Sequence, residues 1–200
     1  MRLFVAVNLP APVRHALALL STELEALDLP VRWVGADTYH LTLRWLGDGD
    51  ERTRDDAAAA MREVAADAEP FTAGFGAVGA FPSPRRPRVI WVAVEADPRL
   101  RLLREELERS FARRGLGRDE RSFRPHVTLG RASRDAPAGA FRPLAAVPEA
   151  RSLDTRFPVL SLDLMRSTLG PHGARYDLLA SATLGAKDFP RTSAACSLDR

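Results

Sequence analysis

The sequence predicts an α+β fold in which antiparallel strands alternate with helices along the chain. Short apolar or alternating runs, typical of strands, are separated by three longer stretches whose apolar residues recur at helical spacing. No apolar run reaches about 18 residues, so no membrane-spanning helix is expected. With 200 residues, 46% of them hydrophobic, the chain can bury one compact core. We expect one domain over residues 1–185 and a disordered tail over 186–200.

The first half of the chain contains three strand segments and two helices. Pro10 and Pro12 suit the first turn of a helix, where a missing N–H costs little. Asp50 suits an N-cap, because its carboxylate can accept from the free amides of a first helical turn. The predicted strands cover residues 3–7, 31–34 and 39–46, and the predicted helices cover 10–27 and 51–67.

The second half repeats this alternation with one helix. Residues 71–81 alternate unevenly and contain three glycines, which indicates a strand with a bulge. Asp97 and Pro98 begin the third helix, and Gly115 ends it. Strands are predicted at 89–94, 126–131, 159–166 and 176–183, and loops at 82–87 and 133–154. This element order favours antiparallel sheets with helices outside.

Two tetrapeptides share one pattern: His40-Leu41-Thr42-Leu43 and His126-Val127-Thr128-Leu129. Alternate side chains of a strand point to opposite faces, so each His shares a face with the Thr two residues later. If the two strands face each other, two imidazoles and two hydroxyls surround one small volume, which suits acid–base chemistry on a phosphate. The alternative is that each tetrapeptide is an ordinary half-buried strand.

Composition argues against several other kinds of site. The single cysteine, Cys196, cannot form an internal disulfide and is interpreted as a free thiol. Neither a cysteine cluster nor a helical histidine pair is present, so no metal site and no cofactor are expected. The N-terminus does not resemble a signal peptide, which favours a cytoplasmic location. A net charge of +3 is compatible with a polyanionic substrate but does not require one.

The chain resembles the two-histidine phosphoesterase superfamily, and within it the RNA 2′,3′-cyclic phosphodiesterases, first described as RNA 2′-5′ ligases. The resemblance extends from Met1 to about Leu184. It implies two pseudo-symmetric lobes of antiparallel sheet with outer helices and an active site in the central cleft. The matching segments are Arg2–Val7, His40–Gly47, Gly79–Ser83, Arg88–Val92, Phe123–Leu129, Ser167–Pro171 and Arg175–Tyr176.

The resemblance also implies an activity, namely metal-independent hydrolysis of RNA 2′,3′-cyclic phosphodiester ends to 2′-phosphomonoesters. By the same resemblance His40 protonates the leaving 3′ oxygen and His126 activates water, although the residues alone do not assign the acid and the base. Thr42 and Thr128 are expected to bind phosphate oxygens. Arg131 is expected to contact the phosphate or stack on the base, with a solvated arginine at a strand end as the alternative.

Other functions fit the same residues. They are RNA 2′-5′ ligation, hydrolysis of another cyclic phosphate or of a 2′-5′ linkage, and a non-catalytic RNA-binding module, which would not need two titratable imidazoles. The expected partners are RNA ends or nucleoside 2′,3′-cyclic phosphates, and a monomer is the default. The arginines of residues 85–88 could contact RNA or be solvated loop charges. His15 and His172 are expected to be exposed. Tyr176 resembles the tyrosine of the family's closing hairpin, which implies that its ring packs beneath the active site.

Overall fold

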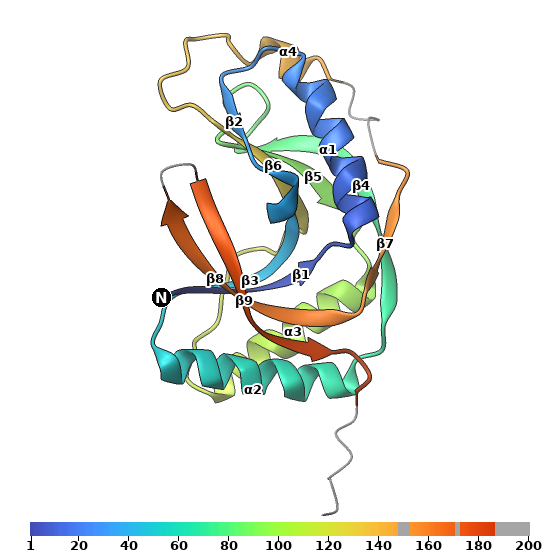
Figure 1. Ribbon diagram of the computed structural model, residues 1–200, viewed down its shortest axis with the longest axis vertical. Coiled ribbons are helices and arrows are strands. Elements are labelled where there is room, and N and C mark those ends of the chain that lie inside the picture. Colours follow the sequence, from blue (N-terminus) through green and yellow to red (C-terminus); the bar gives the residue numbers. More distant parts are fainter. Residues whose placement is uncertain (148–152, 171–172, 187–200) are drawn as a thin grey trace, which may run out of the picture.

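The computed structural model describes residues 1–147, 153–170 and 173–186. Within these ranges, nine antiparallel strands form a sheet in the order β7-β4-β5-β6-β3-β1-β8-β9, with β2 paired to β6 (Figure 1). The predicted α+β class is therefore confirmed. The strands are β1 (Arg2–Asn8), β2 (Val31–Trp33), β3 (His40–Asp48), β4 (Phe71–Phe81), β5 (Val89–Val94), β6 (His126–Ala132), β7 (Arg156–Val159), β8 (Ser161–Gly170) and β9 (Gly173–Thr183). The helices are α1 (Ala11–Glu25), α2 (Glu51–Asp67), α3 (Pro98–Arg113) and the short α4 (Arg142–Ala145), with a 3₁₀ turn η1 at Ala36–Thr38.

The sheet has two halves that meet where β3 pairs with β6. The register of this pair contains a single partnership, Leu41 with Val127. On one side of it lie β6, β2, β5, β4 and β7, and on the other lie β3, β1, β8 and β9. The two predicted lobes thus correspond to halves of one sheet, and the two His–Thr strands are neighbours at its centre.

The two faces of the sheet differ in what covers them. Four apolar residues of the His–Thr strands are buried in the main hydrophobic core, namely Leu41, Leu43, Val127 and Leu129. Residues of α1, α2 and α3 belong to the same core, and α2 packs against α3, β8 and β9 (Figure 1). A separate small cluster contains Phe4, Ala6 and Met165, with Tyr176 packed against it. We call the side of the sheet that carries this cluster the His face, since His40 and Thr42 also point to it.

Capping residues set the beginnings of two helices, as predicted. The Asp50 carboxylate accepts a hydrogen bond from the Thr53 amide at 2.8 Å at the start of α2. The Asp97 carboxylate accepts one from the Arg99 amide at 2.8 Å at the start of α3. Each bond satisfies an amide that has no partner within the helix. The predicted bulge in residues 71–81 is also confirmed, because the register of β4 with β5 shifts between Phe75 and Val78.

The C-terminal part of the chain differs from the prediction in two places. The sequence pattern predicts one strand over residues 159–166, but β7 and β8 are separate strands at distant positions in the sheet: β7 pairs with β4, and β8 with β1. The break falls at Leu160, which is 51% exposed. Within the predicted loop 133–154, α4 forms and buries Leu144. Strand propensity along the sequence does not reveal this break. The two strands differ in the strands with which they pair, β4 and β1, and these lie far away in the sequence.

Some predictions fall on residues outside the described ranges. These are the exposed position of His172, the free thiol of Cys196 and the disordered tail beyond residue 186. Within the described ranges, none of the helices combines the length and the apolar character needed to span a bilayer.

Candidate active site

The sheet register brings the two His–Thr pairs together on the His face. His40 lies opposite Asn8 of β1, and His126 lies opposite Ala93 of β5. Counting outward from the Leu41–Val127 pair in an antiparallel register, Thr42 is the position facing His126, and His40 is the position facing Thr128. The two tetrapeptides therefore supply two imidazoles and two hydroxyls to one region of the sheet, as the repeat predicted.

Both imidazoles are oriented by the same kind of hydrogen bond. His40 Nδ1 lies 2.7 Å from the carbonyl oxygen of Thr38, and His126 Nδ1 lies 2.7 Å from that of Arg124. A carbonyl oxygen can only accept, so Nδ1 carries the hydrogen and Nε2 is the nitrogen left for chemistry. His40 Nε2 is 3.1 Å from the Thr42 hydroxyl. Each ring is thus held in one tautomer by a backbone atom two residues earlier in the chain.

The site is electrostatically unfavourable for additional positive charge. Burial lowers the pKa of His40 most, and the positive charges of His126 and Arg131 lower it further, against an opposing effect of the Thr38 carbonyl. Burial also lowers the pKa of His126, again with a contribution from Arg131 and against the Arg124 carbonyl. Both imidazoles are therefore biased toward the neutral form, and a bound anion would favour their protonation.

Different aromatic side chains surround the two imidazoles. The His40 ring lies 4.9 Å from the Phe4 ring and 5.0 Å from the Tyr176 ring, between centroids. The His126 ring lies 5.1 Å from the Phe81 ring and 6.1 Å from the Trp91 ring. The place predicted for Tyr176 agrees with this arrangement. Phe4 is 1% exposed and packs on the His face rather than in the main core.

Each His–Thr strand has a register shift immediately after its Thr. In β3, Thr42 pairs with Ala6 and Arg44 with Val5, so Leu43 is the extra residue. In β6, Thr128 pairs with Trp91 and Gly130 with Ile90, so Leu129 is extra. A bulge of this kind reverses the alternation of the residues that follow it.

The bulges redirect one further side chain of each strand toward the His face. Trp45 is the fifth residue after His40, and its ring stacks on Phe4 at 5.6 Å between centroids. Arg131 is the fifth residue after His126, and its charge acts on both imidazoles. Simple alternation would place both residues on the core face. The bulge thus gives a structural basis for the predicted proximity of Arg131 to the imidazoles.

Several residues near the imidazoles were not predicted. Asn8, opposite His40, donates from Nδ2 to the Asp163 carboxylate at 2.9 Å. Asp163 is 4% exposed and also accepts from the hydroxyls of Ser161 and Ser181. This network holds Asn8 in place beside the His–Thr strand. Its members come from β1, β8 and β9, so only the sheet order, which no local pattern contains, could have indicated it.

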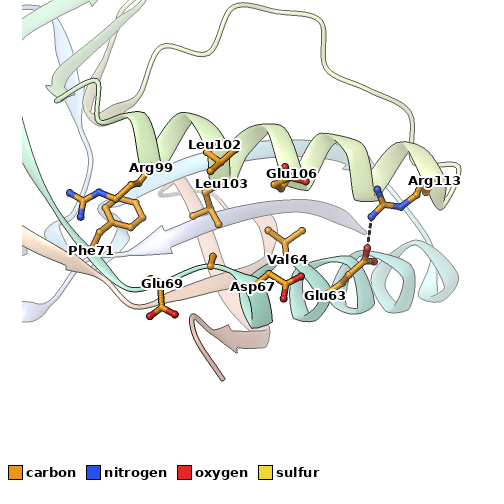
Figure 2. Close-up of a pocket in the computed structure, with 11 residues that line it drawn as sticks. Glu63, Val64, Asp67, Glu69, Phe71, Arg99, Leu102, Leu103, Glu106 and Arg113 are labelled. Carbon is orange, nitrogen blue, oxygen red and sulfur yellow. Dashed lines mark hydrogen bonds and ion pairs between the residues drawn. The ribbon is translucent and has the colours of Figure 1, made fainter. Parts of the chain in front are cut away.

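A cavity of about 460 Å³ lies away from the motif residues, between α2 and α3 (Figure 2). Its lining combines buried apolar residues, such as Val64, Phe71 and Leu103, with charged ones, such as Glu63 and Arg99. It contains none of the His or Thr residues of the motifs, so its volume does not indicate where the chemistry occurs. Its lining is Glu63, Val64, Asp67, Ala68, Glu69, Phe71, Arg99, Leu102, Leu103, Glu106 and Arg113.

Two sequence comparisons match most of the chain to known proteins. The family model of the 2′-5′ RNA ligase superfamily matches residues 14–171. The RNA 2′,3′-cyclic phosphodiesterase of Methanothermobacter thermautotrophicus is 30% identical over 176 residues, which cover 88% of this chain and 94% of that protein.

Two solved structures are similar over almost the whole chain. The crystal structure of TT0787 of Thermus thermophilus has a TM-score of 0.76 and 31% identity, and the match covers 94% of this chain and 100% of that one. The crystal structure of E. coli LigT complexed with 3′-AMP has a TM-score of 0.74 and 27% identity, and the match covers 92% of this chain and 98% of that one. The chain belongs to the 2′-5′ RNA ligase superfamily, the two-histidine phosphoesterases that its motifs resemble.

Proposed function

We propose that this protein hydrolyses RNA 2′,3′-cyclic phosphate ends to 2′-phosphates, with His40 and His126 as its acid–base pair. The observation that carries the proposal is the matched pair of imidazoles on one face of the sheet, each held through Nδ1 by a backbone carbonyl. Further support comes from a relative 30% identical to this chain that is named RNA 2′,3′-cyclic phosphodiesterase. The similar LigT structure contains a nucleotide, 3′-AMP.

The reaction needs one proton removed and one proton delivered. Water attacks phosphorus, and the bond from phosphorus to the 3′ oxygen breaks while the 2′ oxygen keeps its phosphate. His126 Nε2, in the neutral form, takes the proton from water. His40, protonated at Nε2, gives its proton to the departing 3′ oxygen. Each transfer typically contributes about 10²–10⁴ to the rate. The lowered pKa of His126 favours the neutral form that a base needs. The lowered pKa of His40 opposes its protonation, and the negative charge of the bound phosphate offsets this effect.

Hydroxyl and guanidinium groups stabilise the negative charge that develops on the phosphate. Thr42 and Thr128 donate to its non-bridging oxygens, because both hydroxyls share the His face with the imidazoles. Arg131 adds a positive charge, which acts on both imidazoles. No step in this scheme uses a metal, and among the described residues no three His, Cys, Asp or Glu side chains gather as ligands would.

A second activity follows from the same site. Microscopic reversibility allows a 2′,3′-cyclic phosphate to be attacked by a ribose hydroxyl instead of water, which joins two RNA ends. The superfamily description, 2′-5′ RNA ligase, supports keeping ligation as an alternative. A module that only binds RNA would have no use for two oriented imidazoles of lowered pKa.

The test is incubation with adenosine 2′,3′-cyclic phosphate in the presence of a chelator, with the product identified by chromatography against 2′-AMP and 3′-AMP. We expect 2′-AMP, and a large loss of rate in both His40→Ala and His126→Ala. His15→Ala is the matched control, because His15 is exposed on α1. Absence of hydrolysis, or full activity in either motif variant, would overturn the proposal.

A further inference from the structure

Two arginines lie directly opposite each other beside the His face. In the pairing of β2 with β6, Arg32 is the partner of Arg131. Directly opposite residues of antiparallel strands point to the same face. Since the bulge turns Arg131 toward the His face, Arg32 lies on that face too, about 4.8 Å farther out, which is one strand spacing. Val31 and Trp33, its neighbours along β2, pack instead against the main core.

Among the described residues, no carboxylate forms an ion pair with Arg32 or Arg131 to balance their positive charges. Like charges directly opposite each other in a sheet are destabilising. Both arginines are exposed. Other exposed arginines of the sheet are paired, such as Arg166 with Asp177 at 2.9 Å and Arg156 with Glu95 at 3.3 Å. A bound anion would remove the repulsion between Arg32 and Arg131.

The Arg32 guanidinium reaches across the two halves of the sheet. An atom at the Cβ position of Gly173 would lie only 3.4 Å from Arg32 Nη1. Gly173 begins β9. The Arg32 side chain therefore extends from β2, in one half of the sheet, to the end of β9, in the other half. Figure 1 shows the ends of β8 and β9 extending toward β2. Arg32 therefore lies close to the end of β9 as well as opposite Arg131.

We propose that Arg32 binds the phosphate on the 5′ side of the terminal nucleotide and thereby favours RNA ends over cyclic mononucleotides. This inference rests on the proposed function. A 2′,3′-cyclic phosphate occupies both the 2′ and the 3′ oxygens, so the RNA strand can continue only from the 5′ oxygen. The imidazoles and Arg131 hold the cyclic phosphate, and Arg32 holds the next one. A guanidinium suits this role because two of its N–H groups can bind one phosphate.

The test compares two substrates that differ only in the second phosphate and the nucleoside attached to it. They are adenosine 2′,3′-cyclic phosphate and the dinucleotide ApA with a 2′,3′-cyclic phosphate end. We expect Arg32→Ala to lower kcat/KM about tenfold on the dinucleotide, because one charge-assisted hydrogen-bonding group is lost. On the mononucleotide kcat/KM should change less than about twofold, and Arg32→Lys should restore part of the dinucleotide rate. Arg62→Ala is the matched control, since Arg62 is exposed on α2, on the core side of the sheet.

A binding measurement separates this inference from the proposed reaction. Fluorescence anisotropy of a labelled oligonucleotide ending in a 2′-phosphate needs no turnover. We expect weaker binding to Arg32→Ala and a smaller salt dependence, by about 0.7 in the slope of log K against log salt for one lost contact with a single strand. Equal losses of kcat/KM on both substrates would place Arg32 on the cyclic phosphate and overturn the inference. Unchanged binding and unchanged rates in Arg32→Ala would also overturn it. Weaker binding without hydrolysis by the wild type would refute the reaction but not the Arg32 contact.

Discussion

The strands β3 and β6 have the same backbone arrangement around their histidines. Each strand begins with a His whose Nδ1 lies 2.7 Å from a carbonyl oxygen two residues earlier. Each continues with a buried apolar residue, a Thr on the His face and a bulge at the next position. The bulge then returns the fifth residue after the His to the same face. Two copies of one backbone arrangement thus supply two equivalent imidazoles from distant parts of the chain.

The two copies differ in the side chains that fill equivalent positions. At the fifth position β3 has Trp45 and β6 has Arg131. At the fourth, β3 has Arg44 and β6 has Gly130, and both are buried. An added Cβ on Gly130 would lie 2.5 Å from Val31 Cγ1, so this position has no room for a side chain against β2. The backbone therefore places the imidazoles, while their different neighbours add the aromatic ring of Trp45 on the His40 side and the positive charge of Arg131 on the His126 side.

Arg44 is part of a buried ionic cluster that ties β3 to the segment before His126. Its Nε lies 2.9 Å from the Glu108 carboxylate of α3, and Glu108 also pairs with Arg104. The other Glu108 oxygen accepts from the Asp119 amide at 2.8 Å. Asp119 lies in the segment that leads to Arg124, whose carbonyl orients His126. The cluster therefore connects the two His–Thr strands outside the sheet.

The largest effect is expected from removing either imidazole. His40→Ala and His126→Ala should each lower kcat by about 10²–10⁴, since each removes one proton transfer. In a pH profile of kcat/KM, each variant should lose one of the two inflections. Steady-state rates on a cyclic nucleotide measure both effects, with His15→Ala as the control. If the wild-type pH profile of kcat/KM has only one inflection, and His126→Ala keeps it, the two imidazoles do not have equivalent roles in proton transfer.

A somewhat smaller effect is expected from the two hydroxyls. Thr42→Val and Thr128→Val each remove a donor to the charge that develops on the phosphate, at a cost of up to about 10²–10³ in kcat. Thr42→Val should be the more damaging, because the Thr42 hydroxyl is also 3.1 Å from His40 Nε2. The ratio of the two kcat values measures this asymmetry. Equal losses would mean that the bond to His40 has no role in the reaction.

The ionic cluster should affect stability more than chemistry. Arg44→Met removes one partner of a buried charge pair, for which the usual cost is about 3–5 kcal/mol. We expect about 3 kcal/mol, the low end of that range, because Arg104 still pairs with Glu108. Urea unfolding measures the change. Arg109→Met is the matched control, since Arg109 is exposed and its pairs with Glu105 and Glu106 should contribute less than about 1 kcal/mol. A similar loss in both variants would argue against a special role for the cluster.

The smallest effect is a shift in pH dependence. The positive charge of Arg131 lowers the pKa of both imidazoles. Arg131→Gln removes that charge, so both pKa values should rise and the whole bell-shaped profile of kcat/KM should move to higher pH. The profile of kcat/KM is the appropriate measurement, since it reports groups of the free enzyme. A profile that stays in place, or moves to lower pH, would show that Arg131 does not act on the imidazoles.

Local sequence patterns were sufficient for most of the fold and for the centre of the site. The alternation in His40–Leu43 and His126–Leu129 correctly placed each His with its Thr, and Asp50 and Asp97 marked two helix starts. The bulges of β3 and β6, the break at Leu160 and the hydrogen bond from Asn8 to Asp163 were not predicted. Each of these depends on which strand lies alongside, and strand neighbours far apart in the sequence leave no periodic signal. The place of Tyr176 came from family resemblance, not from its surroundings in the sequence.

The central claim is that the imidazoles of β3 and β6 act on a single phosphate group. A crystal structure with 2′-AMP, the expected product, tests it most directly. We expect Nε2 of His40 and Nε2 of His126 each to lie within about 3.2 Å of an oxygen of the same phosphate. A phosphate bound to only one imidazole, or bound away from the His face, would contradict the claim.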